Sequence, residues 1–108
     1  MAWDIILIKS ARNTEPMEEI NEKNTILFDS ANVRNLLENR FSDIEIHSET
    51  WFHYEGGTYA ISFNLAPEQI MLHVHILDEP EDAVETVIKE LCALFDCRAF
   101  DTTAGEFW

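Results

Sequence analysis

Four histidines are the side chains of this sequence whose type and spacing come closest to a chemical site. His73 and His75 lie two residues apart in an apolar segment, and His47 and His53 lie earlier in the chain. Two histidines at positions i and i+2 of a β-strand point to the same face, and a neighbouring strand can supply the further ligands that zinc requires. The pattern therefore permits a metal centre made from His47, His53, His73 and His75.

The same histidines also fit a sheet surface without a metal, and this is our prediction. Histidine is common on half-exposed surfaces, and the spacing alone does not make four rings converge on one ion. We expect no bound metal and no other cofactor. A small metal-dependent enzyme that uses the sheet-face histidines is the alternative.

Other catalytic patterns are missing from the sequence. It contains no glycine-rich phosphate loop, no Gly-x-Ser-x-Gly segment and no cysteine and histidine pair at a recognisable spacing. Cys92 and Cys97 are too few for a disulfide framework, and we interpret both as small structural residues. We interpret Asp101, which precedes Thr-Thr, as a turn residue that hydrogen-bonds the nearby backbone. These observations favour a protein that is not an enzyme.

The charge of the chain limits its partners. Its 108 residues include 7 Lys and Arg against 21 Asp and Glu, which gives a net charge of −14. Such a field repels phosphate groups, so we expect no binding to nucleic acid or to an anionic membrane, and it favours a basic protein partner. The apolar run 5–8 is too short for a signal peptide or a membrane span, and the acidic Asp4 precedes it. We therefore expect a cytoplasmic protein.

The histidines belong to a predicted group of antiparallel strands. Apolar residues alternate with others over 59–65 and again over 70–77, and Gly56-Gly57 marks a hairpin turn before the first of these segments. Residues 44–54 form a further predicted strand, with a bulge near 48–50. Residues 3–8 are apolar on both faces and are expected inside the sheet, with 98–101 as the last strand.

Two amphipathic helices complete the predicted fold. The first follows Asp29-Ser30, either of which can cap it, and the second follows residues 78–82, which offer a capping acid and an early proline. The acidic segment 9–23 is expected to be a surface loop with at most one helical turn. The buried stripes of the helices are predicted to contain Val33, Leu36, Leu37 and Phe41 in the first and Val84, Val87, Ile88, Leu91 and Phe95 in the second.

The order of elements predicts a single α+β domain over residues 1–108. We expect a two-layer sandwich, β-α-β-β-β-α-β, in which both helices cover one face of a mainly antiparallel sheet, with ferredoxin-like character. Strand alternation then assigns all four histidines to the uncovered face. The loop 9–23 or the terminal Phe107-Trp108 covers this face in an alternative arrangement. The predicted binding surface consists of Trp51, His53, Met71, His73 and His75.

Four stretches of the sequence resemble a group of small, largely uncharacterised bacterial α+β proteins from toxin–immunity loci. They are residues 3–7, Trp-Asp-Ile-Ile-Leu; residues 59–65, Tyr-Ala-Ile-Ser-Phe-Asn-Leu; residues 70–74, Ile-Met-Leu-His-Val; and residues 97–107, which contain Asp-Thr-Thr-Ala-Gly-Glu-Phe. The resemblance implies the fold and a cytosolic location, and it brings no established activity.

Small size, strong negative charge and the missing catalytic motif together favour a non-catalytic binding protein. We expect an immunity-type protein that neutralises a basic partner. Self-association into a homodimer through the open sheet face is a further possibility that the sequence leaves open. An RNA-binding module is disfavoured because the chain has too few Lys and Arg to neutralise a phosphate backbone.

Overall fold

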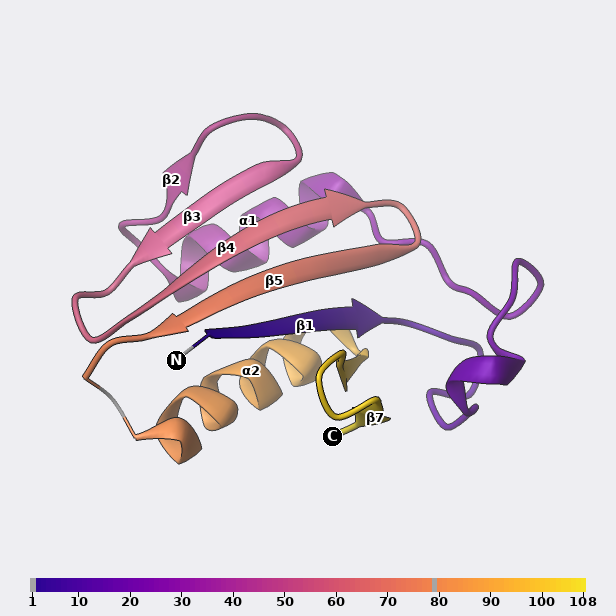
Figure 1. The fold of residues 1–108 in the computed structure, drawn as a ribbon. Coiled ribbons are helices and arrows are strands. Elements are labelled where there is room, and N and C mark those ends of the chain that lie inside the picture. Colours follow the sequence, from indigo (N-terminus) through magenta and orange to yellow (C-terminus); the bar gives the residue numbers. More distant parts are fainter. Residues whose placement is uncertain (1, 79) are drawn as a thin grey trace.

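The computed structural model describes residues 2–78 and 80–108, which form one sheet and two α-helices (Figure 1). The strands are β1 (Ala2–Ile8), β2 (Glu45–Ile46), β3 (Trp51–Glu55), β4 (Tyr59–Ala66), β5 (Gln69–Ile76), β6 (Arg98–Asp101) and β7 (Glu106–Phe107). The helices are α1 (Ser30–Arg40) and α2 (Glu81–Phe95), and a short 3₁₀ helix, η1 (Met17–Glu19), interrupts the loop after β1.

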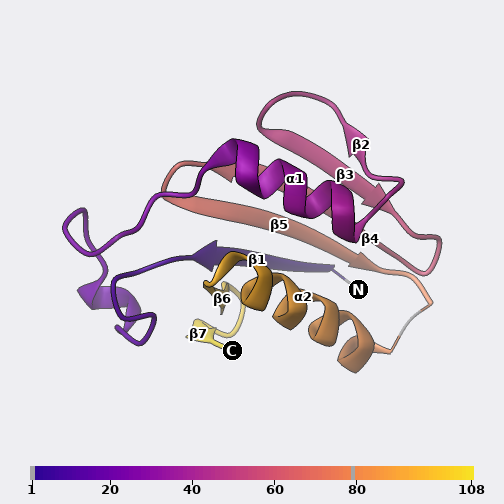
Figure 2. The same cartoon turned by 180° about the vertical axis from the view of Figure 1, so that it is seen from behind.

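All seven strands pair antiparallel in the order β2-β3-β4-β5-β1-β6-β7. The N-terminal strand β1 lies between β5 and β6, as its apolar character on both faces predicts. Both helices lie on the same side of the sheet (Figure 2), which confirms the predicted α+β architecture with one open sheet face. None of the helices in the described part of the chain is long and apolar enough to cross a membrane.

The core lies between the helices and the sheet, where alternate strand residues meet the helix stripes. Ile61 and Phe63 of β4 and Leu72 and Val74 of β5 are fully buried, in agreement with the predicted parity. The helices contribute a continuous apolar stripe to the same cluster. The fully buried or nearly buried helix residues are Val33 and Leu37 of α1 and Val84, Ile88, Leu91 and Phe95 of α2.

The predicted single strand over residues 44–54 is wrong, because this segment folds back on itself. Glu45 pairs with His53 and Ile46 pairs with Phe52, so β2 and β3 form a hairpin whose turn contains the expected bulge region. Short polar residues at 48–50 favour such a turn, and Thr50 N–H donates to Ser48 Oγ at 3.2 Å within it. A second addition is β7, which pairs with β6 after the turn at 102–105.

The starts of the two helices differ in their capping. Asp29 caps α1, since its carboxylate accepts hydrogen bonds from Ala31 N–H at 3.0 Å and Asn32 N–H at 3.4 Å. At α2 the N-cap residue is Pro80, which has no side chain to accept a hydrogen bond, so the predicted capping acid at Asp78 is wrong. Acidic side chains in the first turn of α2 face its positive end instead. Glu79 of the same predicted motif lies outside the described residues.

The acidic loop after β1 is fixed to the sheet by buried polar contacts. Glu15 is only 9% exposed, and its carboxylate accepts hydrogen bonds from Ser10 Oγ at 2.9 Å and from Thr14 N–H at 3.2 Å. Arg98 of β6 donates to the Glu15 carbonyl oxygen at 2.8 Å and to Ser10 Oγ at 3.3 Å. The loop therefore lies beyond the end of β1, at the right of Figure 1, and not over the open sheet face.

Glu15 gives this anchor a specific pH dependence. Burial alone raises the pKa of Glu15, but hydrogen bonds from Ser10 and from backbone N–H groups outweigh burial and lower it to about 2 from an ordinary value of 4.5. Because the folded pKa is below the unfolded one, the stabilisation is complete above about pH 4.5 and is lost as the pH falls toward 2.

We expect Glu15→Gln to lower the melting temperature at neutral pH and to flatten its decline between about pH 5 and pH 2. Thermal unfolding followed by circular dichroism over this pH range measures both effects. Glu18→Gln, which removes an exposed acid from the same loop, is the matched control and should retain the wild-type profile. A Glu15→Gln profile parallel to that of the wild type would contradict the assigned role.

The turn after β6 is held by Asp101, as predicted from its sequence. Asp101 Oδ1 accepts hydrogen bonds from Thr103 N–H at 2.9 Å and Ala104 N–H at 3.2 Å, and Gly105, with φ of 71°, closes the turn. Asp101→Ala should destabilise the protein by about 1 kcal/mol, the usual contribution of such bonds. Urea unfolding measures this change, and Glu106→Ala, which alters an exposed neighbour, should leave stability unchanged. Equal stability of both variants would exclude the structural role.

Candidate functional site

A row of polar side chains crosses the open face of the sheet. The register pairs Glu45 with His53, His53 with Ser62, Ser62 with His73 and His73 with Asp4, so five strands from β2 to β1 each contribute one residue. Side chains directly opposite each other in antiparallel strands are close enough to interact. A central serine is therefore flanked by two histidines, with a carboxylate at each end of the row.

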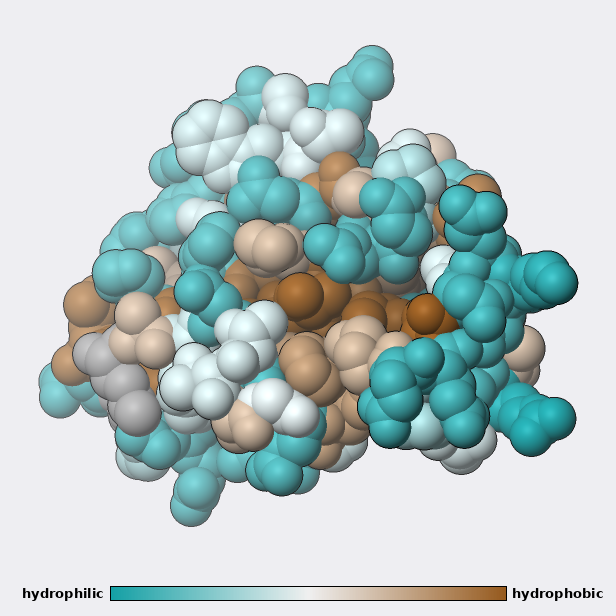
Figure 3. Space-filling model, turned by 45° about the vertical axis from the view of Figure 1, so that its right-hand side comes forward, coloured by the Kyte–Doolittle hydropathy of each residue, from teal (hydrophilic) through white to brown (hydrophobic). Residues whose placement is uncertain are grey.

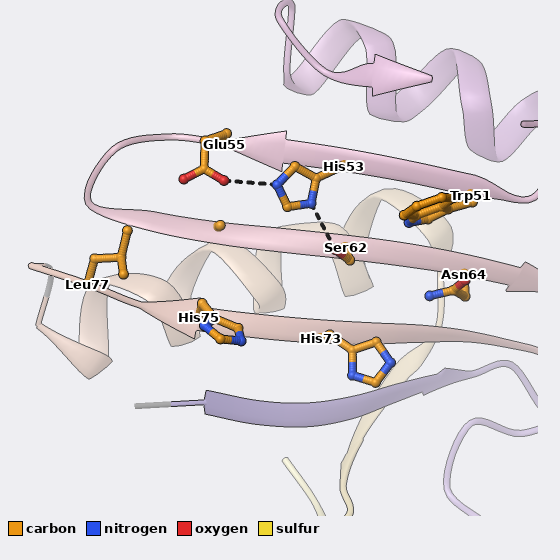
Figure 4. A pocket seen from close by; sticks show the side chains of 9 residues that line it. Trp51, His53, Glu55, Ser62, Asn64, His73, His75 and Leu77 are labelled. Atoms are coloured by element: carbon orange, nitrogen blue, oxygen red, sulfur yellow. Dashed lines mark hydrogen bonds and ion pairs between the residues drawn. The ribbon is translucent and has the colours of Figure 1, made fainter. Parts of the chain in front are cut away.

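His53 is held by hydrogen bonds on both ring nitrogens (Figure 4). Its Nε2 lies 2.9 Å from Glu55 Oε2, and its Nδ1 lies 2.8 Å from Ser62 Oγ. In the neutral ring, Nε2–H donates to the Glu55 carboxylate, which leaves Nδ1 to accept from the Ser62 hydroxyl. The ring orientation of His53 is thus fixed by residues of β3 and β4.

His73 pairs with a different carboxylate. Its Nδ1 lies 2.5 Å from Asp4 Oδ1, so β5 and β1 are joined on the open face by this contact. Asp4 is the member of the site that sequence analysis missed as a partner. Its position in an otherwise apolar strand was visible, but the register that places it opposite His73 was not.

His47 and His75 stand apart from these pairs. His47 follows β2 rather than belonging to a strand, and its ring stacks on Trp51 with a centroid distance of 4.4 Å. Its Nε2 also lies 3.3 Å from Glu45 Oε2. His75 lies on β5 beside the row, and its side chain makes no hydrogen bond or ion pair with any residue in the described ranges.

The histidines do not converge in the way a metal centre requires. Within residues 2–78 and 80–108, no group of three or more His, Cys, Asp or Glu side chains is placed to hold a metal ion. His53 and His73 are instead directed at separate carboxylates. The alternative of a metal-dependent enzyme therefore gains no support from their geometry.

The Ser62, His53 and Glu55 contacts resemble the hydrogen-bond chain of a serine nucleophile, but the surroundings differ. Acyl transfer needs donors preorganised around the developing oxyanion. Ser62 lies in β4, which pairs with β3 and β5 on both sides, so the backbone N–H groups of this strand are used within the sheet. The Glu55 side chain is 56% exposed, which weakens its electrostatic effect on His53. The contacts fix the orientation of His53 and Ser62 on the open face.

A shallow hollow of about 660 Å³ lies over this part of the face. Figure 4 shows the rings of His53, His73 and His75 and the side chain of Asn64 along its floor and sides, with Trp51 at one end and Leu77 at the other. The lining residues are Trp51, His53, Glu55, Ala60, Ser62, Asn64, His73, His75 and Leu77. Four of the five predicted surface residues thus line one hollow, while Met71 lies beside it in register with Asn64.

Large apolar side chains at the two ends of the hollow are exposed. Trp51 is 45% exposed and Leu77 is 59% exposed. Figure 3 shows apolar atoms over the middle of this side of the molecule, flanked by hydrophilic side chains. Such a mixture of an apolar centre and a polar surround is typical of protein contact surfaces.

The C-terminal segment does not cover the hollow. Phe107 of β7 packs on Phe100 and under the Arg98 guanidinium, whose central carbon lies 3.9 Å from the ring centroid. Trp108 packs edge-on against Trp3, with ring centroids 5.6 Å apart. The alternative in which Phe107-Trp108 or the loop 9–23 covers the hollow is therefore wrong for this structure.

The open face is also poor in fixed positive charge. Strands β1 to β5 contain no Lys or Arg in the described ranges, whereas they contribute Asp4, Glu45 and Glu55. Elsewhere, Lys9, Arg34, Arg40 and Lys89 are each within 4.0 Å of an acidic side chain. Most of the basic groups are therefore already neutralised by local acids, and the negative charge is in excess over the surface.

Comparison with known proteins found no match. No protein-family model, no curated protein and no solved structure is significantly similar to the chain. The proposals below accordingly depend on the geometry and charge described above.

We expect the purified protein to contain less than stoichiometric zinc, because its histidines are directed at separate carboxylates. Elemental analysis measures the metal content, and thermal unfolding with and without a chelator should give the same melting temperature. Stoichiometric zinc that is lost in His73→Ala and retained in Glu106→Ala would contradict this prediction and support the metal-dependent enzyme.

Proposed function

We propose that the protein is a non-catalytic binding protein that engages a basic protein partner through the open face of its sheet. The observation that carries the proposal is the uncovered hollow between Trp51 and Leu77, which Glu55 lines and to which the described strands β1 to β5 contribute no Lys or Arg. An immunity-type role, in which the protein neutralises a toxin by binding it, is the specific form of the proposal.

Charge supports a basic partner. With a net charge of −14, the protein attracts a basic surface over a distance of about 8 Å at physiological ionic strength and repels nucleic acid and anionic membranes. Complementary charge mainly speeds association and excludes wrong partners. The association rate of the complex is therefore expected to fall as salt rises.

The exposed aromatic side chain of Trp51 supports a stable complex. Trp51 is a rigid aromatic side chain that is already oriented by stacking on His47. Its burial by a partner therefore costs little side-chain conformational entropy. His53 and Ser62 supply hydrogen-bonding groups next to it with fixed orientation. Burial of Trp51 sets the dissociation rate of the complex, while the acidic side chains of the protein raise its association rate.

We also propose that the core of the fold is ferredoxin-like. Strands β4, β5, β1 and β6 are adjacent in the sheet, and α1 and α2 are the two connections that pass over it, which supports a β-α-β-β-α-β unit. The β2-β3 hairpin and β7 are then additions at the two edges. We also propose a cytoplasmic location.

Self-association through the same face is the competing form of binding. A homodimer would bury the hollow against its own copy, and it would bring two acidic faces together. This repulsion disfavours the homodimer relative to a basic partner at low salt. The two forms are distinguished by the salt dependence of association, since salt strengthens a homodimer of like charge and weakens a complex of opposite charge.

The experiment compares Trp51→Glu with Leu94→Glu as immobilised baits. Leu94 of α2 is 44% exposed, so both variants add one negative charge in place of an equally exposed apolar side chain. We expect the wild type and Leu94→Glu to retain a basic protein at low salt and release it at high salt. Trp51→Glu should lose at least 10-fold in affinity, since an aromatic side chain buried at an interface commonly contributes about 2 kcal/mol to binding.

Direct titration of the captured protein against the three purified chains decides the outcome. Binding that is equal for Trp51→Glu and Leu94→Glu would exclude the open face as the contact surface. Light scattering of the wild type alone over a range of concentrations and salt tests the homodimer. A reproducible hydrolytic activity that is abolished by His73→Ala would overturn the non-catalytic role.

A further inference from the structure

Cys92 and Cys97 lie together where α2 ends and the chain turns into β6. The Cys92 carbonyl oxygen accepts hydrogen bonds from both Asp96 N–H and Cys97 N–H, the latter at 3.0 Å. Asp96 has a left-handed conformation, with φ of 53° and ψ of 55°. The Cys97 bond is the six-residue closure found in the Schellman motif, and the Asp96 bond is that of the αL motif. A side-chain contact between the residues at the two ends of such a turn is frequent.

In most helices an apolar pair occupies these two positions, whereas here both residues are thiols. Cys97 belongs to the apolar core and Cys92 packs against it, and the interaction between the two thiols shifts the pKa of each. Disulfide formation requires nearby Cα atoms and Cβ atoms directed toward each other. The bond from Cys97 N–H to the Cys92 carbonyl oxygen brings the backbones of the two residues close across one turn. The two cysteines therefore have a geometry that an isolated structural cysteine lacks.

The two thiols differ in access and in acidity. Cys92 is partly exposed, whereas Cys97 is buried at 8% exposure. The hydrogen bond from Cys97 lowers the pKa of Cys92 against the opposing effect of burial, while the contact with Cys92 and burial raise the pKa of Cys97. Since the thiolate is the nucleophile, Cys92 is the thiol that reacts first with a reagent from solvent.

We propose that Cys92 and Cys97 form a reversible intrachain disulfide site, oxidised by a small disulfide such as oxidised glutathione. The Cys92 thiolate attacks one sulfur of oxidised glutathione, forms a mixed disulfide and releases one glutathione thiolate. Cys97 then loses its proton and attacks Cys92 Sγ, which forms the intrachain bond and releases the second glutathione. Two protein thiols give up two electrons and two protons, and one oxidised glutathione becomes two reduced molecules.

Formation of the mixed disulfide also makes the second step easier. The contact with Cys92, which is the largest cause of the raised pKa of Cys97, is lost once Cys92 is no longer a free thiol. Burial and Asp96 still raise the pKa of Cys97, and Lys9 still lowers it. The new bond would fix the end of α2 to the start of β6. Asp96 lies between the two cysteines and bonds the acidic loop through Asn13 Nδ2, at 3.0 Å, and through Lys9 Nζ, at 3.8 Å. Oxidation therefore also secures the attachment of the loop.

The test treats the folded full-length protein with oxidised glutathione and follows free thiols and intact mass. We expect the wild type to lose both thiols, to show the loss of two hydrogen masses without retained glutathione, and to recover both thiols with dithiothreitol. The rate should not depend on protein concentration, because the bond forms within one chain. Cys97→Ser should stop at a glutathione adduct on Cys92, and Cys92→Ser should react much more slowly.

Three results would overturn the proposal. They are a folded wild type that keeps both thiols, a wild type that stops at the glutathione adduct, and oxidation that yields only covalent dimers. Repeating the reaction in denaturant separates folded-state chemistry from unfolding, and a reaction that occurs in denaturant alone also contradicts the proposal. Circular dichroism of each serine variant checks that a slow reaction does not reflect loss of the fold.

Discussion

Coverage of only one sheet face by the two helices is the constraint on which the rest of this structure depends. Because side chains alternate along a strand, burial of Leu72 and Val74 under the helices forces His73 and His75 to the other face. The same rule acts in β3, β4 and β1, and the antiparallel register aligns their outward residues into rows. The polar row on the open face is thus a direct consequence of how the core is packed, and a shift of one residue in any strand would invert it.

Hydrogen bonding between the strands gives that open face a fixed form. Asp4 and His73 join β1 to β5, and His53 and Ser62 join β3 to β4, so the strands are linked by side chains as well as by their backbones. Groups that are already paired lose little conformational freedom when a partner covers them, but each must remain paired after water is removed. A partner that complements this face must therefore match the positions of the acids and histidines as well as bury Trp51.

Much of this fold was predictable because its signals are local. Alternation over β4 and β5, the Gly56-Gly57 turn and the helical spacing in α1 and α2 identify their elements from neighbouring residues alone. The β2-β3 hairpin was missed because its turn has neither Gly nor Pro and its first strand is only two residues long. Which residues belong to the site could be predicted from the alternation of side chains along each strand. The contact of His73 with Asp4 depends on the register between β5 and β1, and the contact of Glu15 with Ser10 depends on the path of the loop. Neither of these is encoded in a short segment of sequence. The proximity of Cys92 and Cys97 depends on the left-handed backbone conformation of Asp96, which the sequence alone did not predict.

The two outermost strands, β2 and β7, are each two residues long. Long exposed strand edges invite other chains to add to a sheet through backbone hydrogen bonds, which is a common start of fibril growth. In the described part of the chain, the short edge strands β2 and β7 offer few unpaired backbone groups to which another chain could add. In the binding role that we propose, recognition depends on side chains of the open face, and their substitution leaves the backbone pairing of β1, β4 and β5 in place. Specificity for a partner can then change while the architecture of the sheet stays constant.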